Sequence, residues 1–288
     1  MPQKKDYAAL LLTYILWGFQ PLYWGLLSEV DSYLILACRI VLAAVFSVLL
    51  LALTHKLPEL WALLKDKQAR RLQLPAVVFL FLDWAVFLVA VNAGHVIDTG
   101  LGYYINPLLL FAVGVLLFRE PCTPIQLAAL GIAVVGVVVS AAACGEVPVL
   151  ALVIACNWTV YAAFEKRVPA SGVVSIAAET LYMAPFALLY LLLFRRSDLA
   201  ALNVSQSLWM LGSGIVTALP MYLYSSCVAR FSLIVMCFAQ YLSPTFNLLC
   251  GIIRGEEFSP GQLVSLLFFL AAIVVFTVGE VRNMKKAQ

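Results

Sequence analysis

The stretch DTGLGYYINPLLLFAVGVLLFRE, from Asp98 to Glu120, decides the fold. It is long and apolar enough for a helix in a membrane, and it carries a proline in its first half. A weaker copy, MCFAQYLSPTFNLLCGIIRGEE, runs from Met236 to Glu257. Two apolar helices can look alike by chance, but matched prolines favour an internal duplication. A constant offset of 137 residues pairs Tyr104 with Tyr241, Pro107 with Pro244, Gly114 with Gly251 and Glu120 with Glu257.

The two prolines predict interruptions in their helices. A proline has no N–H, so it removes one backbone hydrogen bond from a helix. Hydrocarbon offers no replacement partner, and the freed carbonyl must be satisfied within the protein or by a cavity. We therefore expect Pro107 and Pro244 to mark helix breaks that face one cavity. Asn106 and Gln240 lie near them in the sequence and can bond either the freed carbonyls or a ligand.

The composition excludes most classes of soluble protein. The chain has 288 residues, of which 64% are hydrophobic and 11% charged, whereas a soluble domain carries about 25% charged residues. A membrane protein with many spans fits, with the lipid bilayer as its surroundings. The net charge of +3 and the absence of a basic, aromatic-rich cluster argue against nucleic acid as a partner. Two isolated histidines and seven cysteines without a CxxC motif predict no metal site and no cofactor.

Ten apolar segments predict an all-α polytopic protein with ten transmembrane helices. A helix needs about 20 residues to cross about 30 Å of hydrocarbon. Between the second and third spans, apolar residues at 57, 60, 61 and 64 predict a short amphipathic helix on the membrane surface. The predicted spans are 7–27, 33–53, 73–93, 98–118, 125–143, 148–165, 174–194, 207–228, 232–253 and 261–280.

The duplication predicts two inverted repeats, residues 1–145 and 146–288, each with five spans. Because five is odd, the second repeat must enter the membrane with the opposite orientation. Inverted repeats are typical of secondary transporters, which bind substrate near the bilayer midplane where the repeats meet. The spans 125–143 and 261–280 carry few polar residues and are expected at the periphery, in a monomer or a homodimer.

The distribution of lysine and arginine predicts that both termini are cytoplasmic. Cytoplasmic loops carry an excess of these residues. Three basic residues fall on the opposite side of the ten-span topology, at 195, 196 and 254. Fourteen fall on the side of the termini: Lys4, Lys5, Lys56, Lys65, Lys67, Arg70, Arg71, Arg119, Lys166, Arg167, Arg230, Arg282, Lys285 and Lys286.

A layer of polar and aromatic residues at the midplane predicts the substrate site. Depth follows from a rise of about 1.5 Å per residue. Aromatic residues normally collect at the membrane interfaces, although core packing is the alternative for each of them. A carboxylate within a span is costly and usually faces a cavity, a partner or an ion path. The predicted substrate-binding residues are Trp17, Asp83, Trp84, Tyr104, Asn106, Trp158 and Tyr241.

Four further residues form a predicted gating or coupling set: Arg39, Asp98, Glu179 and Gln240. Arg39 and Glu179 lie at nearly equivalent places in the second and seventh spans, so they are predicted as gates or counter-ions; a buried structural pair is the alternative for each. Asp98 opens its helix, where an N-cap role is favoured over substrate contact. Asp83 and Glu179 are the candidate proton carriers.

Five motifs along the chain are DWAVFLVAVNAGH (83–95), LGYYINP (101–107), FRE (118–120), AETL (178–181) and QYLSPT (240–245). Together they resemble the RarD proteins, bacterial members of the EamA branch of the drug/metabolite transporter superfamily. The resemblance implies ten helices in a five-plus-five inverted repeat, located in the bacterial inner membrane, that move small metabolites or drugs. Asp83 stands where RarD proteins carry an asparagine, which adds a charge to the implied site.

These observations predict a secondary transporter for a small organic solute and not an enzyme. Aromatic faces attract organic cations and a carboxylate supplies the counter-charge, so a cationic or zwitterionic solute is favoured. The chain has no phosphate-binding loop, so a proton gradient or the solute's own gradient is expected to drive transport. The rival hypotheses are a non-transporting membrane scaffold and a lipid-acting membrane enzyme, which would need a clustered nucleophile and base or a metal set.

Overall fold

The computed structural model describes residues 2–92, 96–144, 149–253 and 260–287. Within these ranges it has thirteen helices and no strand, which confirms an all-α fold. Ten helices or helix pairs coincide with the predicted spans: α1 (Lys4–Gly25), α2 (Ser32–Leu53), α4 (Lys67–Asn92), α5 (Val96–Leu116), α6 (Pro124–Cys144), α7 (Val149–Glu165), α8 (Gly172–Phe194), α10 (Val204–Val228), α11 (Leu233–Gln240) with α12 (Leu242–Ile253), and α13 (Pro260–Ala287).

Apolar helices make the chain a multi-pass membrane protein. Among the described residues, four helices can cross a membrane by length and hydropathy alone: α2, α6, α8 and α10. Apolar segments of α5, α7, α11–α12 and α13 are shorter. The count of ten spans therefore stays a prediction.

The helix expected between the second and third spans is present as α3 (Leu57–Lys65). Its buried residues are Leu60 and Leu63, which belong to a cluster with Val173 and Ala177 of α8. Trp61 is 60% exposed and points away from this contact. The helix therefore packs on the bundle through one face and leaves a tryptophan free for a membrane interface.

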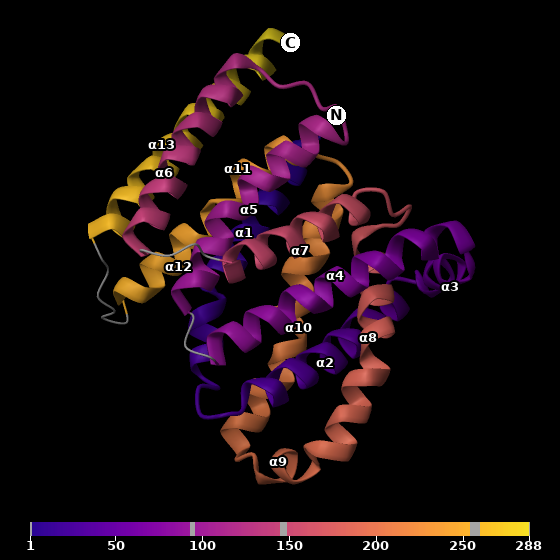
Figure 1. The fold of residues 1–288 in the computed structure, drawn as a ribbon. Helices are drawn as coiled ribbons and strands as arrows, with labels where there is room; N and C mark the ends of the chain where they lie inside the picture. The colour runs from indigo at the N-terminus through magenta and orange to yellow at the C-terminus, as the bar shows by residue number, and fades with distance from the viewer. Residues whose placement is uncertain (1, 93–95, 145–148, 254–259, 288) are drawn as a thin grey trace.

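The contacts between helices follow a two-fold pattern that relates the two predicted halves. Figure 1 shows α6 and α13 side by side at one edge of the bundle, and α2 packs along α8. In addition α5 packs on α7 while α12 packs on α1, and α4 packs on α7 while α10 packs on α1. In the predicted repeats α1, α4 and α5 correspond to α7, α10 and α12. Exchanging these counterparts turns each contact into another contact of the set, as expected of two related repeats. This supports the repeats 1–145 and 146–288, which remain a prediction.

Ion pairs join loops and helix ends at both ends of the bundle. At one end Arg230 pairs with Asp6 near the N-terminus, and Lys166 pairs with Glu120. At the other end Arg195, beside the short helix α9 (Arg196–Ala201), pairs with Asp31 at 3.2 Å. Figure 1 places α9 at the end opposite to both termini. We call the first the inner end and the second the outer end, after the predicted orientation.

The ninth span is interrupted, whereas the fourth is not. Helix α11 ends at Gln240 and α12 begins at Leu242, because Pro244 lacks the N–H that would bond the carbonyl of Gln240. Helix α5 is continuous through Pro107, so the predicted break there is wrong. Its neighbours α7 and α11 pack along it, and one missing hydrogen bond does not end a helix that is supported in this way.

Candidate functional site

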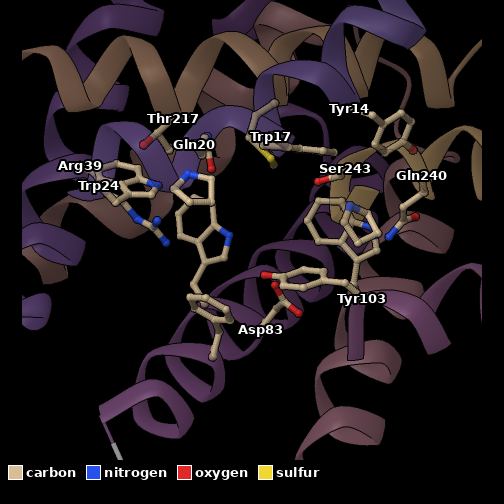
Figure 2. A pocket seen from close by; sticks show the side chains of 16 residues that line it. Tyr14, Trp17, Gln20, Trp24, Arg39, Asp83, Tyr103, Thr217, Gln240 and Ser243 are labelled. Carbon is tan, nitrogen blue, oxygen red and sulfur yellow. The ribbon is translucent and has the colours of Figure 1, made fainter. Parts of the chain in front are cut away.

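A central pocket of about 180 Å³ lies between helices of both predicted halves. Four predicted substrate residues line it, and so do two members of the gating set and one of the two prolines. Figure 2 shows the lining side chains directed into one space. These residues are Trp17, Asp83, Trp84 and Trp158, then Arg39 and Gln240, and finally Pro244.

The pocket contains one acid and one base. Asp83 is 3% exposed, and its Oδ1 has no hydrogen-bond partner. The guanidinium of Arg39 lies 4.5 Å from the ring centroid of Trp84 and 5.7 Å from that of Trp24. Among the ion pairs of the described residues, none involves Arg39 or Asp83. Figure 2 shows Arg39 beside Trp24 and Asp83 beside Tyr103, so both charges face the pocket.

Four aromatic rings close the pocket toward the inner end. Trp17 and Trp158 meet edge to face with centroids 5.2 Å apart. Tyr224 lies 5.4 Å from Trp17 and 5.1 Å from Trp158, and Tyr14 lies 5.6 Å from Trp17. Tyr14 and Tyr224 are fully buried. We call these four residues the aromatic floor; it gives the pocket a base of ring faces and edges.

Asn106 supports the pocket without lining it. Its Nδ2 donates to the carbonyl of Ala155 in α7 at 3.0 Å, and its Oδ1 accepts from Nε2 of Gln240 at 2.8 Å. Asn106 therefore does not line this pocket, and its predicted contact with substrate stays a prediction. The residue instead links α5 and α7 to the break between α11 and α12, where Gln240 reaches the pocket with Oε1 unpaired.

Tyr104 and Tyr241 do not line the pocket, contrary to expectation. Their rings stack on Phe269 of α13, with centroids 4.2 and 5.0 Å away. The neighbouring Tyr103 faces the pocket instead. Successive residues are rotated by about 100° around a helix axis, so the adjacent side chains of Tyr103 and Tyr104 point to different neighbours. Core packing, the alternative for these aromatics, is what the structure shows at 104 and 241.

The remaining predicted residues fall elsewhere. Glu179 is fully buried behind the aromatic floor and accepts from the hydroxyl of Tyr161 at 3.3 Å. Arg39 lines the pocket and Glu179 does not, and their predicted role as gates or counter-ions stays a prediction. Pro107 lies in α5 away from the pocket lining. The side chain of Asp98 lies outside the described residues.

Sequence reasoning missed nine lining residues, among them Gln20, Trp24 and Tyr103. The first two follow Trp17 at helical spacing on α1, a signal that could have extended the predicted layer outward. Their positions mean that the pocket runs from the midplane toward the outer end of α1.

A carboxylate closes the inner end of the bundle. Glu120, after α5, accepts from the backbone N–H groups of Leu233 at 2.8 Å and Ile234 at 3.1 Å, the first two amides of α11. Nζ of Lys166, just after α7, lies 3.4 Å from Glu120 and donates to the carbonyl of Phe231 at 2.6 Å. A carboxylate is favourable at a helix N-terminus, where amides are free and the helix dipole is positive. We call this contact the inner latch; it joins the two predicted halves.

Known proteins with similar sequences include uncharacterized transporters and RarD proteins. The model of the EamA-like transporter family matches residues 5–142, a range that coincides with the first predicted repeat. The chain is 33% identical to the uncharacterized transporter YojE of Bacillus subtilis, over 97% of this chain and 95% of the relative. It is 31% identical to the uncharacterized transporter PA0485 of Pseudomonas aeruginosa, over 98% and 96% of the two chains. Protein RarD of Streptomyces exfoliatus is also 31% identical, over 96% of this chain and 89% of the relative.

A solved crystal structure shares the fold. Its TM-score is 0.74 with 17% sequence identity, and the match covers 98% of this chain and 99% of the other. The fold match, the family model and the full-length relatives agree with each other. The chain belongs to the EamA-like transporter family and resembles the RarD proteins of the drug/metabolite transporter superfamily along nearly its whole length.

Proposed function

We propose that this protein is a secondary transporter that moves a small zwitterionic solute across the bacterial inner membrane by alternating access. The observation that carries the proposal is that two groups of opposite charge, Arg39 and Asp83, lie in one pocket with aromatic walls, and no salt bridge among the described residues involves either of them. The cavity of about 180 Å³ is smaller than the roughly 300–1,000 Å³ of sites for drug-sized ligands. A small metabolite therefore fits better than a large drug.

The position of Arg39 favours a zwitterion over a simple cation. Its guanidinium already occupies the faces of Trp24 and Trp84, where an organic cation would otherwise bind. Arginine binds carboxylates through two parallel hydrogen bonds, and Asp83 provides the matching acceptor for an ammonium group. Both charges are then paired when the solute is bound. A non-transporting scaffold, the rival hypothesis, has no need of two buried groups of opposite charge that form no salt bridge among the described residues.

Alternating access is supported by the difference between the two ends. The pocket reaches Trp24 near the outer end of α1, whereas the aromatic floor and the inner latch separate it from the inner end. With cytoplasmic termini, this conformation faces outward. Inward opening requires Glu120 to leave the N-terminus of α11 while the two halves rock about the pocket.

Matched ligands test the charge requirement. The thermal unfolding of the purified chain is measured with three sets that share a side group: phenylalanine, phenethylamine and phenylpropionate; tryptophan, tryptamine and indolepropionate; leucine, isoamylamine and isocaproate. Because bound ligand stabilises the folded state, we expect one or more amino acids to raise the midpoint and their cationic and anionic partners to fail. Equal shifts by all three members of a set, or no shift in any set, would contradict the proposal.

Two variants locate the bound ligand. Arg39→Gln and Asp83→Asn should each abolish the stabilisation by the zwitterion, because each leaves one of its charges without a partner. Tyr104→Phe is the control, since Tyr104 packs on Phe269 outside the pocket and should keep full binding. Uptake of the radiolabelled ligand into proteoliposomes then tests transport. Binding without uptake by the wild-type chain would favour the scaffold.

A further inference from the structure

Two buried acids face each other behind the aromatic floor. Glu165, the last residue of α7, is 3% exposed, and Glu179 in α8 is fully buried. The helix spacing brings them together, because Glu165 lies one turn from Tyr161 on α7 and Glu179 lies one turn from Ser175 on α8. Ser175 donates its hydroxyl to Oε2 of Glu165 at 2.9 Å, and Tyr161 donates to Oε2 of Glu179 at 3.3 Å. The pair joins the inner end of α7 to the middle of α8.

One oxygen of this pair has no partner. Oε1 of Glu179 is buried and receives no hydrogen bond. Ionised carboxyl groups only accept hydrogen bonds, so the two acids can bond each other only when one of them carries a proton. Two adjacent negative charges in a buried site are also strongly unfavourable, which leads such pairs to hold one proton between them.

No cation is among the described groups that interact with Glu179. The phenols Tyr161 of α7 and Tyr224 of α10 face the pair. Helices α2, α3, α4 and α9 also pack on α8, and no charged group of their described residues is among the interactions of Glu179. The nearest lysine in sequence, Lys166, is held by Glu120 and the carbonyl of Phe231.

We propose that Glu165 and Glu179 form a proton-binding site that shares one proton while the inner latch is closed, and that loss of this proton to water at the inner end loosens the latch. The pair is placed to do so. Tyr161 connects it to the aromatic floor, with its ring 5.3 Å from that of Trp158. On the other side, Glu165 directly precedes Lys166 of the latch. Once the proton leaves, two carboxylates repel, and the end of α7 moves away from α8 together with Lys166.

Infrared titration of the full-length chain in lipid nanodiscs tests the shared proton without any transport substrate. Near neutral pH, the wild type should show a protonated carboxyl stretch that shifts in D₂O. Glu165→Gln and Glu179→Gln should each lose this band completely, since the new amide donates to the remaining carboxylate and makes a proton unnecessary. Asp83→Asn, which changes the carboxyl of the pocket, should retain it. Should one glutamine variant fail to fold, the other gives the same measurement.

Two infrared outcomes would overturn the proton site. One is a wild-type spectrum that is identical to the glutamine variants in this region. The other is a band that survives in each single variant and disappears only in the double variant, because the acids would then be protonated independently.

A separate distance measurement tests the coupling between the proton site and the inner latch. Spin labels at the exposed positions Arg119 and Arg167, on either side of the latch, report its opening in a background without cysteine. Alkaline pH should shift the wild-type distance distribution to longer values, and Glu165→Gln should remove this dependence on pH. An unchanged wild-type distance would refute the coupling to the latch. This part of the proposal rests on the proposed transport function, but neither measurement uses a transported solute, so failed transport with an intact band would count against the function alone.

Discussion

Replacing Glu120 by glutamine should open the inner end. The carboxylate bonds two amides of α11 and lies 3.4 Å from Lys166, and the two side chains are 10% and 17% exposed. A carboxylate at a partly buried helix N-terminus contributes about 1–2 kcal/mol. Glutamine keeps one acceptor oxygen but loses the charge. We therefore expect the closed state to lose about 1–2 kcal/mol, which raises the population of the open state by roughly tenfold.

The native Cys237 reports this change. It lies in α11, about one turn after the amides that the inner latch binds, and it is 1% exposed. A thiol reagent therefore reaches it only when the inner end opens. In a chain that keeps Cys237 as its single cysteine, Glu120→Gln should speed its modification by about tenfold, in line with about 1.4 kcal/mol per factor of ten. Glu29→Gln is the matched control, because Glu29 is exposed near the outer end of α1. An unchanged rate in Glu120→Gln, or an equal increase in Glu29→Gln, would refute the latch.

Three further predictions concern stability, measured as thermal unfolding of the purified chain. Gly18→Ala should destabilise by about 1–3 kcal/mol, because a Cβ at this position would lie 2.3 Å from Cβ of Phe246 and overpack the contact of α1 with α12; a wild-type midpoint would show that the helices adjust. Asn106→Leu should cost about 1–3 kcal/mol, since the buried amide of Gln240 loses its acceptor and the carbonyl of Ala155 keeps only the donor Thr159 at 2.7 Å; Tyr104→Phe provides a nearby comparison with little expected effect. The hydrogen bond from the backbone N–H of Gln3 lowers the pKa of Asp6, so its stabilising effect is present above the ordinary carboxyl pKa and is lost as the pH falls through the lowered value. Asp6→Asn should therefore melt below the wild type at neutral pH and together with it in acid; a constant difference would contradict this assignment.

Much of the architecture can be predicted from the sequence because lipid restricts what a backbone can do. Every N–H and C=O in hydrocarbon needs a partner within its own segment, so apolar runs of sufficient length become helices. The predicted spans at 33–53 and 174–194 correspond closely to α2 and α8. A proline lacks its donor wherever it lies, which explains the break before Pro244. The continuous α5 shows the limit of this rule, because neighbouring helices can hold a helix together through Pro107.

The depth of a residue in a helix follows from its position in the sequence, and this reasoning identified Trp17, Asp83, Trp84 and Trp158 as one layer. The direction in which a side chain points around the helix axis does not follow from its position in the sequence. Tyr103 faces the pocket while Tyr104 stacks on Phe269, and only the packing of α5 against its neighbours decides between them. Hydropathy carries no information on this choice in a helix that is apolar on every face.

By itself, the sequence determined the helical membrane fold, the depth of the polar and aromatic layer, and the family. The tertiary structure decided which charges meet. It brought Arg39 into the pocket of Asp83, Glu165 against Glu179, and Glu120 onto the first amides of α11. These contacts join different helices, and their geometry depends on how those helices cross and rotate against each other. That arrangement is set by the simultaneous packing of many side chains, which no local pattern of residues records.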